Sequence, residues 1–137
     1  MPVYNNEICV QTTGGTDIID LTQQVAREVK ESSVENGTVL LFIPGSTSAL
    51  TTIEFEKGVI NDLKKAIEKI APEDIYYEHN EKWHDGNGYS HVRAALIGPS
   101  LHIPLIDGRM TLGTWQQIVL LDFDNRPRSR RIIVQIS

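Results

Sequence analysis

The sequence contains a single cysteine, Cys9, so no disulfide can form within the chain, and nothing indicates an oxidising compartment. It also has no run of about 18 apolar residues, and its N-terminus lacks a basic start followed by an apolar stretch. We therefore expect neither a membrane span nor a secretion signal, and a cytoplasmic protein. Cys9 stands in the alternating run EICVQT, and we expect it to be a small core residue.

An excess of positive charge is absent as well. The chain has 13 Lys and Arg against 18 Asp and Glu, for a formal net charge of −5. Because no overall positive field would attract phosphates, the composition disfavours a nucleic acid or an anionic membrane surface as a partner. The length of 137 residues with 40% hydrophobic content fits a single domain, residues 1–137, that can bury its own core.

The order of the predicted elements indicates an α+β fold, with a largely antiparallel β-sheet backed by two main helices and a short third helix. The two main helices are expected where apolar residues recur at helical spacing, and a shorter one before Gly98, over residues 21–33, 58–72 and 90–98. The expected strands are residues 6–13, 38–43, 74–79, 100–106, 110–123 and 130–136.

The turn residues refine this arrangement. Asp107-Gly108 between two strand-like runs predicts a hairpin. Pro104 lies inside the run SLHIPLI, which indicates an edge strand or a bulge, because proline cannot donate to a sheet ladder. Edge strands need cover, and a second copy of the chain is one way to supply it. An oligomer is therefore expected.

The first polar cluster contains three histidines and an aspartate, namely His79, His84, Asp85 and His91. Imidazole and carboxylate groups together are the usual ligands of a catalytic zinc or a related divalent ion. The spacing matches no fixed metal motif such as HExxH. The alternative is that these histidines cap helices or satisfy buried backbone groups, and the spacing alone leaves both interpretations open.

The second polar cluster is GSTSALTTIEFE, directly after a buried strand. Its start places backbone N–H groups and the hydroxyls of Ser46, Thr47 and Ser48 where an anion could sit. It lacks the lysine of a P-loop, and a turn held by its own hydroxyls is the alternative. Glu54 and Glu56 would share one face of a strand, where paired carboxylates hold a cation or perform acid–base chemistry.

The third polar cluster is GTWQQIVLLDFDNRPRSRR. Asp122 and Asp124 share a face if the strand continues. Arg93, Arg109 and the arginines of residues 126–131 carry the planar guanidinium that suits phosphate. The alternative is a solvated edge on which opposite charges cancel.

Several of these segments together resemble the YjbQ-like family of uncharacterised proteins, whose members are often labelled secondary thiamine-phosphate synthase enzymes. The segments are GSTSALTTIEFE, YYEHN, DGNGYSHVRAALIGPSLHIPLIDGRMTLGTWQQIVLLDFD and RPRSRRIIVQ, which cover nearly the whole chain. The blocks LGTWQ and SHVRAALIGPS are specific to that family. The resemblance implies a helix-backed antiparallel sheet assembled as a homotrimer, with a polar pocket near subunit contacts in which some members carry a bound metal.

The family's histidines correspond to His79 and His91 here. Its other matching polar positions are Ser46, Thr47, Ser48, Glu54, Asn80, Asn87, Trp115 and Gln116. The chain departs from the pattern at Ser46 and Tyr89, where many members have histidine. The resemblance therefore implies fewer imidazoles, with Glu54 and either Asp85 or His84 completing the ligand shell. The loss of imidazoles argues against zinc, and such an oxygen-rich shell suits magnesium or manganese.

The label implies joining a pyrimidine diphosphate to a thiazole phosphate with release of pyrophosphate. That chemistry needs a divalent ion on the diphosphate, donors for the departing charge and a shielded cavity. We therefore expect a metal-assisted enzyme acting on a small phosphorylated metabolite. The alternatives are a non-catalytic trimer that binds a metal or a small anion, and hydrolase-like chemistry through a metal-bound water.

Residues are assigned to these roles as follows. The expected catalytic residues are Glu54, His91, Arg93, Trp115 and Gln116. The expected ligand-binding residues are Ser46, Thr47, Ser48, Asn87 and Arg109. The expected ligands of a divalent metal, zinc or magnesium, are His79, His91, Glu54 and Asp85. These assignments require the histidines and Glu54 to share one cavity.

Overall fold

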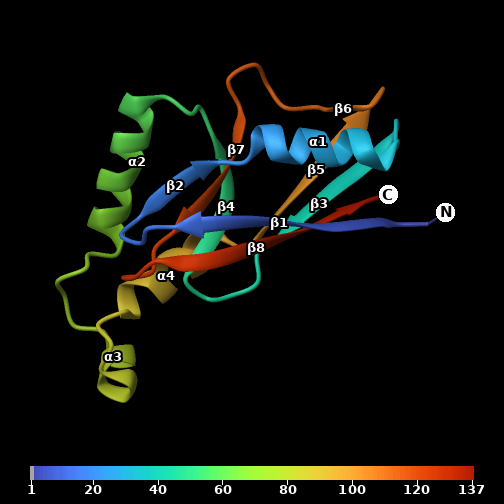
Figure 1. Ribbon diagram of the computed structural model, residues 1–137. Coiled ribbons are helices and arrows are strands. Elements are labelled where there is room, and N and C mark those ends of the chain that lie inside the picture. The colour runs from blue at the N-terminus through green and yellow to red at the C-terminus, as the bar shows by residue number, and fades with distance from the viewer. Residues whose placement is uncertain (1) are drawn as a thin grey trace.

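The computed structural model describes residues 2–137, which form two antiparallel sheets and four helices (Figure 1). The strands are β1 (Tyr4–Thr12), β2 (Asp17–Asp20), β3 (Gly37–Phe42), β4 (Ser48–Ile53), β5 (Ser100–Ile106), β6 (Arg109–Met110), β7 (Gln117–Asp122) and β8 (Arg128–Ile136). The helices are α1 (Thr22–Ser32), α2 (Lys57–Ile70), α3 (Glu78–Trp83) and α4 (Gly88–Ile97). The predicted α+β fold is confirmed, with α3 as an additional short helix.

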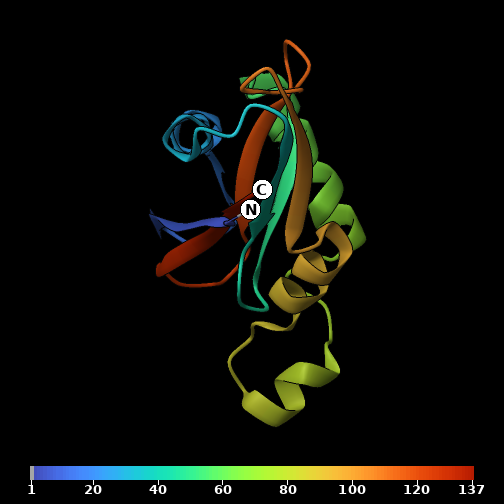
Figure 2. The same ribbon diagram turned by 90° about the vertical axis from the view of Figure 1, so that its right-hand side faces the viewer.

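The strand order is β1-β8-β3-β5-β6 in the larger sheet and β2-β7-β4 in the smaller one. Every strand pair that the structure describes is antiparallel, as predicted. The first and last strands pair with each other, with Tyr4 opposite Ile136. The two ends of the chain therefore lie close together, as Figure 2 shows.

The smaller sheet lies between two hydrophobic cores. Leu50, Ile118 and Leu120 belong to the core that α1 and the larger sheet complete. The alternate residues of the same strands, which include Ala49 and Val119, belong to the core shared with α2 and α4. Figure 2 shows α1 on one side of the smaller sheet and α2 and α4 on the other. Burial of both faces explains why β7 reads as a continuous apolar run.

Three local expectations were wrong. Residues 74–77 are not a strand, and the histidine after them lies in α3. The strand expected over residues 110–123 is interrupted, because β6 ends at Met110 and Trp115 lies in a turn before β7. Cys9 is exposed, because the alternation of β1 turns its neighbours Ile8 and Val10 into the core.

The predicted hairpin is confirmed. Asp107 and Gly108, both with positive φ of 52° and 77°, join β5 to β6 in an antiparallel pair. Because β6 has only two residues, most of the outer side of β5, including Pro104, lies at the edge of the sheet. Among residues 2–137, no helix is long and apolar enough to cross a membrane.

Candidate functional site

A pocket of about 320 Å³ lies between the loop that leads into β4 and helix α4. We call it the histidine pocket. Its lining residues are Gly45, Ser46, Ser48, His91, Ala94, Ala95 and Pro99. The structure thus brings the predicted hydroxyl-rich loop and one predicted histidine to the same place.

A second histidine, His79 of α3, lies against His91. The rings of His79 and His91 lie with their centroids 4.3 Å apart and are tilted by 39°. Asp85 Oδ1 is 3.8 Å from His79 Nδ1, and that nitrogen is buried without a hydrogen-bond partner among the described residues. Burial, and then the neighbouring His79, lower the pKa of His91, so His91 is a neutral imidazole near pH 7.

The short connection between α3 and α4 fixes the position of these histidines. Asn80 accepts a hydrogen bond from the backbone N–H of Gly88 at 3.0 Å. A Cβ on Gly88 would lie 2.6 Å from the Cβ of Tyr77, so only glycine allows the two segments to approach this closely. Asn87 accepts hydrogen bonds from the Ser90 hydroxyl and from the backbone N–H of Asn125, and it thereby holds the start of α4.

The serine that begins β4 is the other functional group of the pocket. The Ser48 side chain is only 3% exposed, and its Oγ has no hydrogen-bond partner among residues 2–137. Two charged residues fix Thr47, the preceding residue. Its hydroxyl donates to Asp124 Oδ2 at 3.0 Å and accepts from Arg130 Nη2 at 2.7 Å. The loop before β4 is therefore held in place, and the hydrogen-bonding capacity of the buried Ser48 hydroxyl is unused within the described chain.

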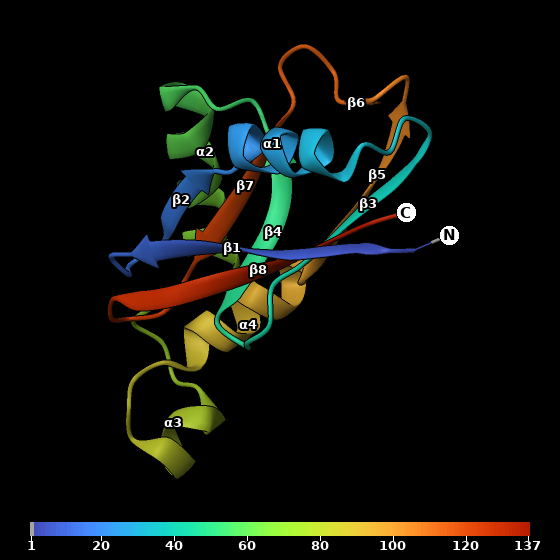
Figure 3. The same ribbon diagram turned by 45° about the vertical axis from the view of Figure 1, so that its right-hand side comes forward.

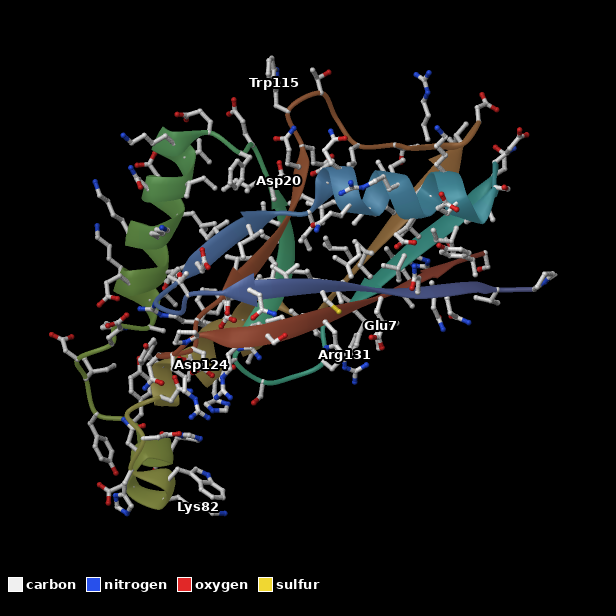
Figure 4. The ribbon with its side chains drawn as sticks, in the orientation of Figure 1. Glu7, Asp20, Lys82, Trp115, Asp124 and Arg131 are labelled. Carbon is white, nitrogen blue, oxygen red and sulfur yellow. The ribbon has the colours of Figure 1, made fainter. Side chains whose placement is uncertain are left out.

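Buried charges lie directly behind this loop. Asp122 and Asp124 are fully buried. Arg130 donates to both oxygens of Asp122 at 2.7 and 2.9 Å, and Arg128 donates to Asp124 at 3.1 Å. Figure 4 shows Asp124 beside α4, at the end of the molecule that carries α3. The two acids and two bases cancel in formal charge, and their hydrogen bonds tie β7 and β8 to the loop.

These contacts set the ionisation of the two acids. Burial acts to raise the pKa of Asp122, but hydrogen bonds from Arg130, Thr12 and the Asp124 backbone outweigh it and lower the pKa. Burial likewise acts to raise the pKa of Asp124, and hydrogen bonds from Thr47 and Arg128 lower it. Both carboxylates are therefore ionised at neutral pH, and each stays ionised to a lower pH than an ordinary aspartate does.

Glu54 and Trp115 lie in a different pocket, of about 470 Å³, which we call the tryptophan pocket. Its lining residues are Asp20, Thr22, Gln23, Glu54, Phe55, Glu56, Trp115 and Gln117. The Trp115 side chain is 70% exposed. Figure 4 shows Trp115 and Asp124 at opposite ends of the molecule.

Strand β4 separates the two pockets. Ser48 is its first residue and Glu54 follows its last, so at roughly 3.3 Å per residue these two backbones lie about 20 Å apart. Figure 3 shows β4 running between the two ends. The structure therefore does not bring Glu54 to the histidines within one chain. The expected pairing of Glu54 with Glu56 is also absent, because Glu56 caps α2 and accepts from the backbone N–H groups of Gly58 and Val59.

Arg93, expected in a catalytic role, is a buried residue whose hydrogen bonds connect neighbouring elements of the fold. Its Nε donates to the Ala71 carbonyl at 2.9 Å, its Nη1 to Thr16 Oγ1 at 3.0 Å, and its Nη2 to Glu68 at 2.5 Å. The guanidinium also lies 4.8 Å from the ring centroid of Tyr89. Arg93 therefore connects α4 to the end of α2. Its guanidinium packs on the ring of Tyr89, one of the two departures from the family pattern.

Two further predicted residues also lie away from the histidine pocket. Arg109 is exposed and lines a separate hollow next to α1. Gln116 lies just before β7, where it donates to Thr52 Oγ1 at 3.0 Å and accepts from the backbone N–H of Gly113. Within one chain neither side chain contributes to the histidine pocket.

The donor set does not fit a resident metal ion within one chain. Two imidazoles and the Asp85 carboxylate lie near one another, but over residues 2–137 no three His, Cys, Asp or Glu side chains are placed to hold an ion together. The fourth expected ligand, Glu54, lines the other pocket. A complete ligand shell would need a group from outside the single chain.

The sequence did not identify Asp122 and Arg130 as parts of the pocket's support. The available signal was a pair of acids two residues apart, followed after a short turn by arginines two residues apart, Arg128 and Arg130. Equal spacing on two successive strands allows each acid to meet one base. The pattern fitted a solvated edge equally well, because spacing carries no information about burial.

Two antiparallel sheets, with helices on both sides of the smaller one, enclose the core of this class of protein. Its pocket, between α4 and the loop before β4, is lined by two serines, a histidine and small apolar residues. The family model "UPF0047 protein YjbQ-like" matches residues 6–137, and the chain therefore belongs to the YjbQ-like UPF0047 family. This confirms the family that the sequence motifs indicated.

Individual relatives agree. A UPF0047 protein of Methanothermobacter thermautotrophicus is 38% identical over 137 residues, which are 100% of this chain and 94% of that protein. A YbjQ-like protein of unknown function from Sulfolobus solfataricus P2 superimposes with a TM-score of 0.93 at 32% identity, covering 98% of this chain and 96% of that one. An uncharacterised YjbQ/UPF0047 protein from Clostridium acetobutylicum gives a TM-score of 0.88 at 33% identity, with 96% and 99% coverage.

Proposed function

We propose that the chain binds a small phosphorylated metabolite in the histidine pocket and acts on it as an enzyme. The observation that carries this proposal is that Ser48, a lining residue of the pocket, has a buried hydroxyl without a hydrogen-bond partner among the described residues. A buried hydroxyl without a partner is costly, and a ligand oxygen would satisfy it. Placed beside His91, this hydroxyl suits an oxygen-rich ligand.

Each part of the pocket has a role in this proposal. Ser48 donates a hydrogen bond to a phosphate oxygen. His91, neutral near pH 7, accepts or donates a proton at a ring nitrogen, and His79 lies against its ring. The small apolar side chains of Ala94 and Ala95 contact the non-polar part of the ligand.

The named reaction is thiamine-phosphate synthesis, which rests on the resemblance to family members that carry this label. A single chain supplies the phosphate-binding and proton-transfer groups, whereas Glu54 and Trp115 lie in the tryptophan pocket. We therefore propose a homotrimer in which the tryptophan pocket of one copy closes the histidine pocket of the next. That arrangement would bring Glu54 to the histidines and complete a set of divalent-metal ligands.

The test is turnover of pyrimidine diphosphate and thiazole phosphate with magnesium by the pure protein. We expect wild-type protein to form thiamine phosphate, and Ser48→Ala to lower kcat/KM about tenfold or more through loss of one hydrogen bond to a charged oxygen. Ser129→Ala is the matched control, because Ser129 is exposed on β8, and its kcat/KM should stay within about twofold of wild type. Glu54→Gln should also lose activity if two copies share the site.

Two results would count against this account. If wild-type protein forms no thiamine phosphate, the named reaction is wrong. If Ser48→Ala retains full activity while the wild type is active, the reaction occurs outside the histidine pocket. Ser48→Ala is expected to fold normally, because its hydroxyl has no partner to lose within the described chain.

The second candidate function is non-catalytic binding of a small anion. It is favoured by the incomplete set of metal ligands within one chain, since binding needs only the hydroxyls and the backbone of the loop. Tight binding of phosphate by a protein that turns over neither substrate would support this candidate over the enzyme.

A further inference from the structure

We infer that Arg130 supplies a guanidinium N–H donor by which the histidine pocket selects an anion. This inference rests on the proposed function and adds a residue that determines ligand specificity. Arg130 belongs to β8, and its side chain is 11% exposed, so its position is set by the interior of the protein.

Two nitrogens of the Arg130 guanidinium, Nε and Nη2, donate hydrogen bonds within the protein, and the third, Nη1, is called the free corner below. Nε and Nη2 donate to Asp122, and Nη2 also donates to Thr47 Oγ1. No hydrogen bond from Nη1 is found among residues 2–137. Nη1 is also not enclosed like the buried unpartnered atoms of Ser48 and His79. The free corner therefore has donor capacity that the protein itself does not use.

Arg130 itself is not a lining residue of the histidine pocket, but its free corner lies next to Gly45, which is one. Gly45 lines the histidine pocket and has φ of 123°, a conformation that side chains rarely adopt. A Cβ at this position would lie 3.3 Å from Arg130 Nη1 and 4.0 Å from Ser48 Oγ. Two donors that have no partner among residues 2–137 therefore lie beside Gly45, and in this inference one phosphate group accepts from both.

Asp122 orients the Arg130 guanidinium and leaves Nη1 able to donate to a ligand. Asp122 accepts two parallel hydrogen bonds, which fix the plane of the guanidinium and direct Nη1 toward the loop. Phosphate is the favoured ligand, because its tetrahedral oxygens accept from a guanidinium corner and a hydroxyl at the same time.

Arg131, the next residue, provides the contrast. It lies on the opposite face of β8, is half exposed, and pairs with Glu7 at 2.9 Å. Figure 4 shows Arg131 and Glu7 near each other. Arg131 carries the same charge as Arg130 but lies away from the pocket. Substitution at the two positions therefore changes net charge equally and changes the pocket only at Arg130.

The test is isothermal titration of inorganic phosphate and of pyrophosphate into the full-length protein. We expect Arg130→Gln to weaken binding about tenfold or more, because a charge-assisted hydrogen bond is lost. The affinity of Arg131→Gln should stay within about twofold of wild type. Arg130→Lys should bind more tightly than Arg130→Gln but less tightly than wild type, because lysine keeps the positive charge but lacks the planar guanidinium with its several N–H donors. Equal affinity of Arg130→Gln and wild type, or equal loss in both glutamine variants, would overturn the inference.

A second variant guards against misfolding. Arg130→Gln leaves the buried Asp122 carboxylate without its main partner, so the double variant Asp122→Asn/Arg130→Gln, which removes both charges, is titrated alongside it. It should fold and bind phosphate about as weakly as the single variant, and wild-type affinity in this protein would contradict the role of Arg130. If the wild-type protein binds neither anion, the proposed function fails as well. If the wild type binds and both Arg130 variants bind as tightly as the wild type, only the role of Arg130 fails.

Discussion

Arg93→Met is expected to lower the free energy of unfolding by roughly 3 kcal/mol. The substitution keeps most of the side-chain volume but removes the donors that reach Ala71, Thr16 and Glu68, and it leaves the buried Ala71 carbonyl without this partner. Urea denaturation at pH 7 measures the change. The affinity of the folded variant for inorganic phosphate should be unchanged, because Arg93 does not line the histidine pocket.

The matched control for Arg93→Met is Arg109→Met. Both arginines were expected to contact the ligand, but Arg109 is exposed, so its substitution should change stability by less than about 0.5 kcal/mol. A stable Arg93→Met protein that no longer binds phosphate would show that Arg93 reaches the ligand, as the sequence suggested, and that its structural role is secondary.

Asp122→Ala is expected to cost roughly 4 kcal/mol, because it leaves Arg130 largely buried with its main partner removed. It also removes the acceptor of the Thr12 hydroxyl. The double variant Asp122→Asn/Arg130→Gln should recover much of this loss, since no unpaired charge then remains buried. Urea denaturation of Asp122→Asn, Arg130→Gln and the double variant measures the coupling; additive losses would show that Asp122 and Arg130 act independently.

The loss at Asp122 should depend on pH in one direction. The folded-state pKa of Asp122 lies below its ordinary value of 3.8, so between the two values the unfolded chain binds more protons than the folded one. The stabilisation is therefore complete above that ordinary value and is lost as pH falls through the folded pKa. The difference in unfolding free energy between wild type and Asp122→Ala should shrink over this acidic range and stay constant from pH 6 to 8.

Much of the fold followed from local pattern. Helical spacing of apolar residues located α1 and α2, and the Asp107-Gly108 turn located the hairpin. Strands β2 and β4 were not predicted, because β2 has only four residues and Ser or Thr occupies three of the six positions of β4. Helix α3 has six residues, too few to show a period.

The site was predicted only in part, because sequence distance does not measure distance in space. Ser48 and His91 come together across the pocket, although they are far apart in the chain. Glu54 is close to Ser48 in sequence, but an extended strand carries it to the other end of the molecule. The role of Arg130 depends on burial between strands, which charge spacing alone does not reveal.

The most direct test of the account is a ¹H–¹⁵N NMR titration of the protein with inorganic phosphate. The account predicts that the largest shift changes occur at residues 44–48 and in α4 around His91, with little change at the indole of Trp115. Changes centred on Trp115 and Glu54, or no saturable change anywhere, would contradict the claim that the histidine pocket binds the phosphorylated ligand.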